Sequence, residues 1–458
     1  MTSKKAIFRQ TLILLPVYVN VVLMGATVGW IANALYLLKQ PSAIGKAITF
    51  TQGSWIAAST QVGKLVFAIP AGILTDKIGR KKICTGVAVT NVVCWLTLSI
   101  SQSIGMIFFI RFMQGVTIAL LHSVALMLIG EIASPRLRGT YVGMYQVCSY
   151  TGTLFESIVA VIFPSYRILA YATTALGLIY FALFWWLEES PSYLLSTGKD
   201  SLGFQVLRHI RPDSTESELN EEFDSMKRSI NAEKERKNTS NFMQFLFSPV
   251  NRNCLLLMIT MHFFACFTGS APLSSYVTLI LPKNNYVEKK FYPLISVSLK
   301  ISSAMGVSFI LDKLPRKVLY VSVTILVFVV QMANGFLSLF RTLFGSNWDI
   351  AYIIGNYVFL LIWASFLEPI NDLVRSEILP QNIKGFGSSL CVMSMAASKA
   401  LSYTLFETIS INMGMSWNYW IFAINSLITA FVVYFALPES RGKSLADIQH
   451  KMSNDVNS

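Results

Sequence analysis

Two related signatures, each an acidic residue followed closely by basic residues, end long apolar segments in the two halves of this chain. The first is Asp-Lys-Ile-Gly-Arg-Lys-Lys at residues 76–82, and the second is Asp-Lys-Leu-Pro-Arg-Lys at residues 312–317. A second pair follows other apolar segments, with Glu-Glu-Ser-Pro at 188–191 and Pro-Glu-Ser-Arg at 438–441. This self-similarity predicts a tandem of two related halves.

The composition places both halves in a membrane. Of the 458 residues, 53% are hydrophobic and only 13% are charged, which excludes an ordinary soluble domain. Continuous apolar runs of roughly 20 residues, enough to cross about 30 Å of hydrocarbon, predict about twelve transmembrane helices and not the strands of a barrel. The predicted spans are centred near Met24, Val66, Val93, Ala119, Thr151, Leu178, Phe267, Ala304, Val329, Phe359, Ser398 and Leu427.

The positions of these spans predict four parts in an all-α integral membrane protein. Residues 1–190 form an N-terminal six-helix lobe and residues 253–440 a C-terminal six-helix lobe, related as pseudo-repeats. Between them, residues 191–252 form a polar cytoplasmic linker with short helices, and residues 441–458 form a cytoplasmic tail. Thr215 in the linker is spaced from an acidic residue as in a capping box. A solute site between two such lobes is typical of secondary transporters.

Lysine and arginine residues gather in the loops on one side of the predicted bundle. By the positive-inside rule this side is cytoplasmic, which places both termini in the cytoplasm of a multi-pass protein. We expect its membrane to be the plasma membrane. The net charge of +13 fits anionic lipid head groups at the helix ends, so we expect no nucleic-acid partner. The expected surroundings are the lipid bilayer, and the expected working unit is a monomer.

Several motifs, in order along nearly the whole chain, resemble the sugar porter family of the major facilitator superfamily. Besides the signatures above, they include Arg-Phe-Met-Gln-Gly at 111–115, Glu-Ile-Ala-Ser-Pro-Arg-Leu-Arg-Gly at 131–139 and Pro-Glu-Ser-Arg-Gly-Lys-Ser-Leu at 438–445. Within that family, Gly-Trp at 29–30 and Ser-Trp-Ile at 54–56 are most similar to the insect facilitated trehalose transporters. The resemblance implies the major facilitator fold and facilitated transport of a sugar, a hexose or trehalose, by alternating access.

The resemblance also implies two charge clusters that hold the lobes together when the inner side is shut. Exposed ion pairs are worth about 0 to 1 kcal/mol each, so a network can bias two states without locking either. The alternative is that these charges only fix the topology. Lys384 and Ser192 stand where the family usually has arginine, which would loosen the gate. The first cluster would comprise Asp76, Arg80, Glu131, Arg138 and Glu189, and the second Asp312, Arg316, Glu377, Lys384 and Glu439.

Sugar porters bind their solute midway through the membrane, where every sugar hydroxyl needs a hydrogen-bonding partner. The resemblance carries the binding glutamine of the fifth span to Gln146. Ser149, Tyr150 and Thr153 lie near it at helical spacing and are predicted to line the same cavity. In the seventh span, Tyr276 stands where the family has an aromatic residue of the solute site. For Gln146, the alternative is a hydrogen bond between helices.

The second half departs from the family at its other pocket positions. Alanine or cysteine stands at three places in the seventh span where amides are usual, Lys300 stands at an asparagine place, and Asp372 stands at a tryptophan place. An intramembrane lysine costs roughly 2.5 to 3.5 kcal/mol, so Lys300 needs a partner or a wet cavity. We expect Lys300 to pair with Asp372 or Glu368, either as part of the solute site or as a structural ion pair.

Three functions follow from these features. The first is a facilitative sugar carrier, and Ile31, which stands where proton-coupled members have an acidic residue, favours it. The second is a proton-linked or charged-solute carrier on the same scaffold, and the third is a non-transporting solute sensor. An enzyme is not expected, and no catalytic residue, metal site or cofactor is predicted, because the scattered histidines show no metal-ligand or triad spacing.

Overall fold

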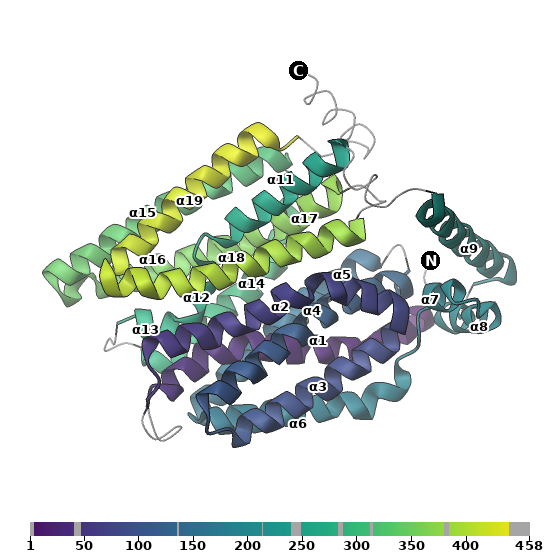
Figure 1. The fold of residues 1–458 in the computed structure, drawn as a ribbon, viewed down its shortest axis with the longest axis horizontal. Helices are drawn as coiled ribbons and strands as arrows, with labels where there is room; N and C mark the ends of the chain where they lie inside the picture. The colour runs from purple at the N-terminus through teal and green to yellow at the C-terminus, as the bar shows by residue number, and fades with distance from the viewer. Residues whose placement is uncertain are drawn as a thin grey trace.

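The computed structural model describes residues 4–40, 47–134, 137–212, 214–239, 249–282, 287–311, 315–379 and 384–438. Within these ranges the regular structure is entirely helical, and the long helices form two stacked groups, the earlier part of the chain below the later part in Figure 1. The first group, the N-terminal lobe, comprises α1 (Lys4–Leu38), α2 (Phe50–Ile78), α3 (Arg80–Ile100), α4 (Ile104–Ile132), α5 (Arg138–Ile162) and α6 (Tyr166–Leu183), followed by a 3₁₀ turn at Phe184–Trp186.

The second group, the C-terminal lobe, has two interrupted spans. It comprises α11 (Pro249–Cys266), α12 (Ser270–Ser275), α13 (Val277–Ile280), α14 (Tyr292–Leu311), α15 (Arg316–Phe344), α16 (Asp349–Ile362), α17 (Glu368–Ile378), α18 (Lys384–Asn412) and α19 (Met415–Ala436), with 3₁₀ turns at Lys289–Phe291 and Ser346–Trp348. Gly269, in a left-handed conformation with φ of 88°, separates α11 from α12. A π-helical turn, Trp363–Leu367, joins α16 to α17, and such turns often mark functional sites.

Nine helical stretches in the described part of the chain are long and apolar enough to cross a membrane. They include all the long helices of the two lobes except α5, α14 and α18, which carry many of the polar side chains of a central cavity. Together the two sets account for the expected spans, and the prediction of an all-α membrane protein is confirmed.

Two short helices, α7 (Pro191–Ser196) and α8 (Asp200–Ile210), and the longer α9 (Glu216–Thr239) lie between the lobes in the chain, at one end of the bundle. We call this the linker end. The expectation of short linker helices is therefore met by α7 and α8 and is wrong for α9, which has 24 residues. The capping box at the start of α9 is confirmed, because the Thr215 amide donates to Glu218 Oε2 at 2.9 Å and the Glu218 amide donates to Thr215 Oγ1 at 3.3 Å. Arg211 fastens the linker to the N-terminal lobe by donating to the carbonyl oxygen of Ile132 at 2.8 Å.

Glycines let the helices of the N-terminal lobe approach backbone to backbone, as is common between membrane helices. In the contact of α2 with α4, a Cβ atom at Gly115 would lie 2.0 Å from the carbonyl oxygen of Thr60. In the contact of α1 with α5, a Cβ atom at Gly152 would lie 1.9 Å from the carbonyl oxygen of Val22. These contacts fix the positions of α2 and α5, both of which line the cavity.

The lobes meet through α2 packed against α18 and α5 packed against α14. At the end opposite the linker, the Tyr276 hydroxyl donates to Ser54 Oγ at 3.0 Å, and Thr278 Oγ1 donates to the carbonyl oxygen of Ala32 at 3.1 Å. Phe50 packs on the ring of Tyr276 at the same place. The lobes are therefore tied together at the end away from α7–α9.

Candidate functional site

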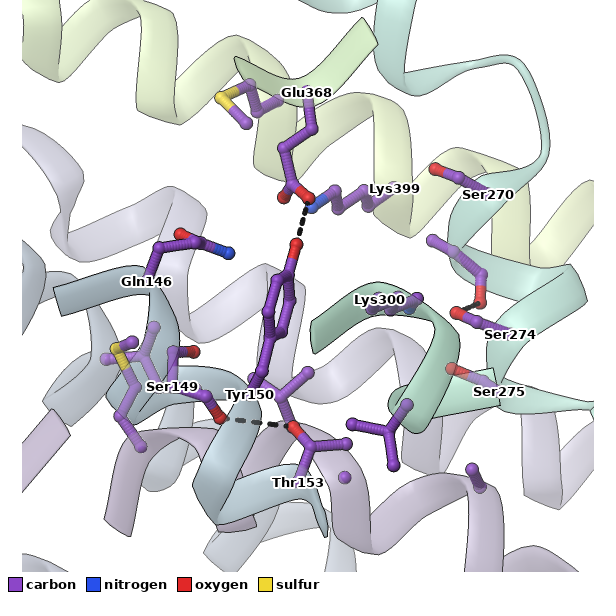
Figure 2. A pocket seen from close by; sticks show the side chains of 18 of the residues that line it. Gln146, Ser149, Tyr150, Thr153, Ser270, Ser274, Ser275, Lys300, Glu368 and Lys399 are labelled. Atoms are coloured by element: carbon purple, nitrogen blue, oxygen red, sulfur yellow. Dashed lines mark hydrogen bonds between the residues drawn. The ribbon is translucent and has the colours of Figure 1, made fainter. Parts of the chain in front are cut away.

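A cavity of about 220 Å³ lies between the lobes. Its lining comes from α1, α2, α4 and α5 of the N-terminal lobe and from α12, α14, α17 and α18 of the C-terminal lobe. Figure 2 shows polar side chains from both lobes around this space. Five of the predicted solute-binding residues line it: Gln146, Tyr150, Thr153, Lys300 and Asp372.

The predicted face of α5 forms one wall of the cavity. Gln146, Ser149, Tyr150 and Thr153 all line it, as their helical spacing requires. Thr153 Oγ1 donates to the carbonyl oxygen of Gly25 at 3.0 Å, which holds this wall against α1. Figure 2 shows the amide of Gln146 pointing toward the hydroxyl of Tyr150. This wall thus presents amide and hydroxyl groups of the kind that bind sugar hydroxyls.

The hydroxyl of Tyr150 forms a hydrogen bond between the two lobes. It donates a hydrogen bond to Glu368 Oε2 at 2.8 Å, and Glu368 begins α17 directly after the π-helical turn. Tyr150 is buried, so this bond is shielded from bulk water. The two lobes therefore share a polar contact within the cavity itself.

Hydroxyl groups of the short helix α12 form part of the opposite wall, where the sequence lacks the family's amides. Ser270, Ser274 and Ser275 all line the cavity. The Ser275 hydroxyl is hydrogen-bonded to the hydroxyl of Tyr403 at 2.7 Å. Ser270 Oγ, in contrast, is buried with no partner in the described part of the chain. A buried hydroxyl of this kind is satisfied when a solute hydroxyl binds to it.

The expected ion pair of Lys300 is not the one that the structure contains. Asp372 pairs instead with Arg375, one turn along α17, with 3.0 Å between Arg375 Nη2 and Asp372 Oδ1. Glu368 accepts the hydrogen bond of Tyr150. Lys300 lines the cavity, and within the described residues no acidic group lies within 4 Å of its amino group. The prediction of a Lys300 pair is therefore wrong, because each acid has a nearer partner.

Tyr276 was predicted to line the solute site, and the structure places it elsewhere. It is buried outside the cavity lining, stacked on Phe406 and hydrogen-bonded to Ser54 across the lobes. The break at Gly269 starts a new helix, so the spacing of one continuous span no longer gives the direction of side chains beyond it. Tyr276 therefore closes the end of the molecule opposite the linker.

Sequence reasoning missed three titratable residues of the cavity. Lys64 on α2, His122 on α4 and Arg375 on α17 line it, beside Lys399 on α18, whose place inside an apolar span is visible in the sequence. The ring of His122 is hydrogen-bonded to the Tyr145 hydroxyl at 3.0 Å. The available signal was a charged residue inside an apolar span, which marks a functional position by default. Applied to Lys64, that rule would have found it.

At the linker end, Arg80 brings most of the first predicted charge cluster together. Its Nη2 atom lies 3.3 Å from Asp76 Oδ1 and 3.2 Å from Glu131 Oε1, and its side chain is only 8% exposed. Glu189 Oε1 accepts the backbone N–H of Arg80 at 2.8 Å and that of Lys81 at 3.2 Å, and so caps α3. Arg138 begins α5, but its side chain lies outside the described part of the chain.

The second cluster is described only in part. Arg316 Nε lies 3.2 Å from Glu377 Oε1, which ties α15 to α17 as predicted. Asp312 and Glu439 lie outside the described residues, as does the side chain of Lys384 at the start of α18. Arg80 and Arg316 thus hold equivalent positions, each at the start of a helix and each paired with an acid of its own lobe.

Metal-ligating groups do not gather at any point of the described chain. Among the residues that were placed, no three side chains of His, Cys, Asp or Glu lie in a group that could hold a metal ion. The six cysteines are all free thiols, five of them buried.

Comparison with known proteins points to one family. The family described as Sugar (and other) transporter matches residues 15–452. The facilitated trehalose transporter Tret1-2 homolog of Drosophila sechellia is 24% identical over 99% of this chain and 93% of its own length. The facilitated trehalose transporter Tret1 of Culex quinquefasciatus is 23% identical over 99% of this chain and 87% of its own.

Solved structures show the same fold. The inward open conformation of the xylose transporter XylE from E. coli has a TM-score of 0.79 at 17% identity, over 96% of this chain and 99% of that chain. The proton:xylose symporter XylE bound to 6-bromo-6-deoxy-D-glucose has a TM-score of 0.76 at 16% identity, over 97% of this chain and 99% of that one. The expected major facilitator fold is confirmed.

Proposed function

The chain belongs to the Sugar (and other) transporter family and is a membrane transporter of sugars, and on this premise we propose that the cavity between its lobes is the solute site. One observation carries the proposal: amide groups of the N-terminal lobe and hydroxyl groups of both lobes line a single cavity. A site shared by both lobes changes access when the lobes rock, which gives facilitated alternating access. The unpartnered hydroxyl of Ser270 supports binding of a solute that carries hydroxyl groups.

The curated relatives are named for trehalose, so a hexose or trehalose is the first candidate solute. We place the linker end in the cytoplasm, together with both termini, and the protein in the plasma membrane as a monomer surrounded by lipid. The contacts at the end opposite the linker support an inward-facing state, because Tyr276 and Thr278 tie the lobes together there. No chemical reaction, cofactor or nucleic acid is part of this function.

Sugar flux into proteoliposomes tests the proposal. Purified protein should take up labelled glucose or trehalose with saturable kinetics at each of two external pH values, and empty liposomes give the background. A rate that does not change with pH fits facilitated diffusion. If the protein binds sugar but produces no flux above empty liposomes, it is a sensor and the transport proposal is wrong.

Arg80 should control how the linker end opens. Arg80→Gln removes the partner of Glu131, which is 19% exposed, and of Asp76, which is 56% exposed. The cost comes mainly from the Arg80–Glu131 pair, since breaking a buried pair costs about 3 to 5 kcal/mol and an exposed pair contributes little. If the cluster stabilises the state that is closed at the linker end, exchange of sugar should slow by at least about tenfold while sugar binding is kept. The measurement is counterflow in proteoliposomes beside sugar binding in detergent.

A matched control exists at the same end of the molecule. Arg208→Gln removes the same charge from α8, but its pair with Glu216 is exposed, with side chains 64% and 76% exposed. Exposed pairs contribute little, so this variant should transport like the wild type. If Arg80→Gln exchanges sugar at the wild-type rate, the cluster only fixes the topology, which is the alternative considered for these charges.

A further inference from the structure

The cavity between the lobes carries more positive than negative charge. Four cationic side chains line it against two carboxylates, and the cations come from both lobes. They are Lys64 on α2, Lys300 on α14, Arg375 on α17 and Lys399 on α18, and the carboxylates are Glu368 and Asp372. A neutral sugar needs no such excess, because hydroxyl and amide groups satisfy it.

Both carboxylates are already engaged. Asp372 pairs with Arg375 at 3.0 Å, and Glu368 accepts a hydrogen bond from Tyr150 at 2.8 Å. In the described part of the chain, no acidic group lies within 4 Å of the amino groups of Lys64, Lys300 or Lys399. The nearest aromatic contact of Lys399 is loose, with its Nζ atom 5.9 Å from the centre of the Trp363 ring. Glu368 still attracts Lys300 and Lys399 from beyond ion-pair distance. Four cations against two carboxylates nevertheless leave the lining with an excess of two positive charges.

These lysines repel one another across the interface of the lobes. Lys64 belongs to the N-terminal lobe and feels the charges of Lys399 and Arg375 from the C-terminal lobe. Within the C-terminal lobe, Lys300 is attracted by Glu368 and, less strongly, repelled by Lys399. Figure 2 shows Lys300 and Lys399 directed toward the same space as Tyr150, Gln146 and the serines of α12. Like charges at membrane depth are costly unless water or an anion compensates them.

We propose that the sugar carried through this cavity bears an acidic group, a carboxylate or a phosphate, which binds among Lys64, Lys300 and Lys399. The inference rests on the proposed function and specifies its substrate class. The hydroxyl groups of such a sugar bind Gln146 and the α12 serines, as those of a neutral sugar would. The anion removes the repulsion between Lys64 and Lys399 and draws the two lobes together, so binding itself favours closure of the cavity.

Competition between matched sugars tests this proposal. Glucuronate differs from glucose by one carboxylate, and glucose 6-phosphate by one phosphate, so the two acids distinguish a carboxylate site from a phosphate site. In proteoliposomes, at least one of the two should be taken up with a kcat/KM about tenfold or more above that of glucose, because its hydrogen bonds to lysine are charge-assisted. The same acid should compete with labelled glucose and trehalose.

Lysine variants assign the effect to the cavity. Lys64→Gln, Lys300→Gln and Lys399→Gln should each lower the acid-to-glucose preference about tenfold, and Lys399→Arg should restore most of it. Lys227→Gln is the matched control, since Lys227 lies on α9 and pairs with Asp200 far from the cavity. The acid-to-glucose preference of Lys227→Gln should equal that of the wild type.

The outcomes separate this inference from transport itself. Uptake of glucose or trehalose, with neither acid transported nor competing, overturns the acidic-sugar inference and leaves the sugar carrier intact. An absence of any sugar flux contradicts the transport function. Thermal unfolding of the wild type in detergent then shows whether the cavity binds an acidic sugar. Stabilisation by glucuronate or glucose 6-phosphate but not by glucose supports the anion site, and equal effects of acids and glucose overturn it.

Discussion

A methyl group on Gly115 should push α2 away from α4 and destabilise the N-terminal lobe. Its Cβ atom would lie 2.0 Å from the carbonyl oxygen of Thr60 and 2.9 Å from the amide nitrogen of Lys64. Both are backbone atoms, so no side chain can turn aside. Ordinary overpacking costs about 1 to 3 kcal/mol, and we expect Gly115→Ala to reach at least the upper end of this range. Gly115→Val should leave no folded protein.

Gly130→Ala is the matched control for this prediction. Gly130 lies on the same helix α4, and a Cβ atom there would meet nothing within 4 Å. In detergent, the midpoint temperature of thermal unfolding should fall by about 6 to 12 °C for Gly115→Ala, which corresponds to a loss of about 3 kcal/mol in the free energy of unfolding. The midpoint of Gly130→Ala should stay unchanged. Equal midpoints for the two variants would mean that α2 and α4 can move apart at no cost, which would contradict a close backbone contact at Gly115.

The fold could be predicted because its signals are local. Each span can be recognised by an apolar run long enough to cross the bilayer, and the two related halves can be recognised by their repeated motifs. The Arg80 cluster was expected from the family resemblance, and its pair with Asp76, four residues earlier, is the one part that helical spacing alone indicates. The α5 wall followed from helical spacing around Gln146.

The charges of the cavity could not be paired from sequence spacing. Asp372 was expected to reach across to Lys300, but Arg375 lies three residues along the same helix and is the nearer partner. Tyr276 was misplaced because the chain breaks at Gly269, so helical spacing does not continue past that point. Lys64 and Lys399 line the same cavity because α2 packs along α18, and that packing joins segments far apart in the chain.

Gln146→Ala should abolish most sugar uptake while the protein stays folded. Gln146 lines the cavity on the α5 wall, and Figure 2 shows its amide directed into the space beside Tyr150 and Glu368. Without the amide, a bound sugar hydroxyl loses its partner inside a desolvated site, which costs about 1 to 3 kcal/mol. The value of kcat/KM for the transported sugar should fall about 10- to 100-fold in proteoliposomes.

Two companion variants make this result specific to the cavity. Gln205→Ala removes the same side chain from an exposed position on α8 and should transport like the wild type. Gln146→Asn keeps the amide but shortens its reach, so its loss should lie between those of the wild type and Gln146→Ala. If Gln146→Ala keeps wild-type uptake but its thermal unfolding midpoint falls, the amide joins helices and does not bind solute, which was the alternative for this residue.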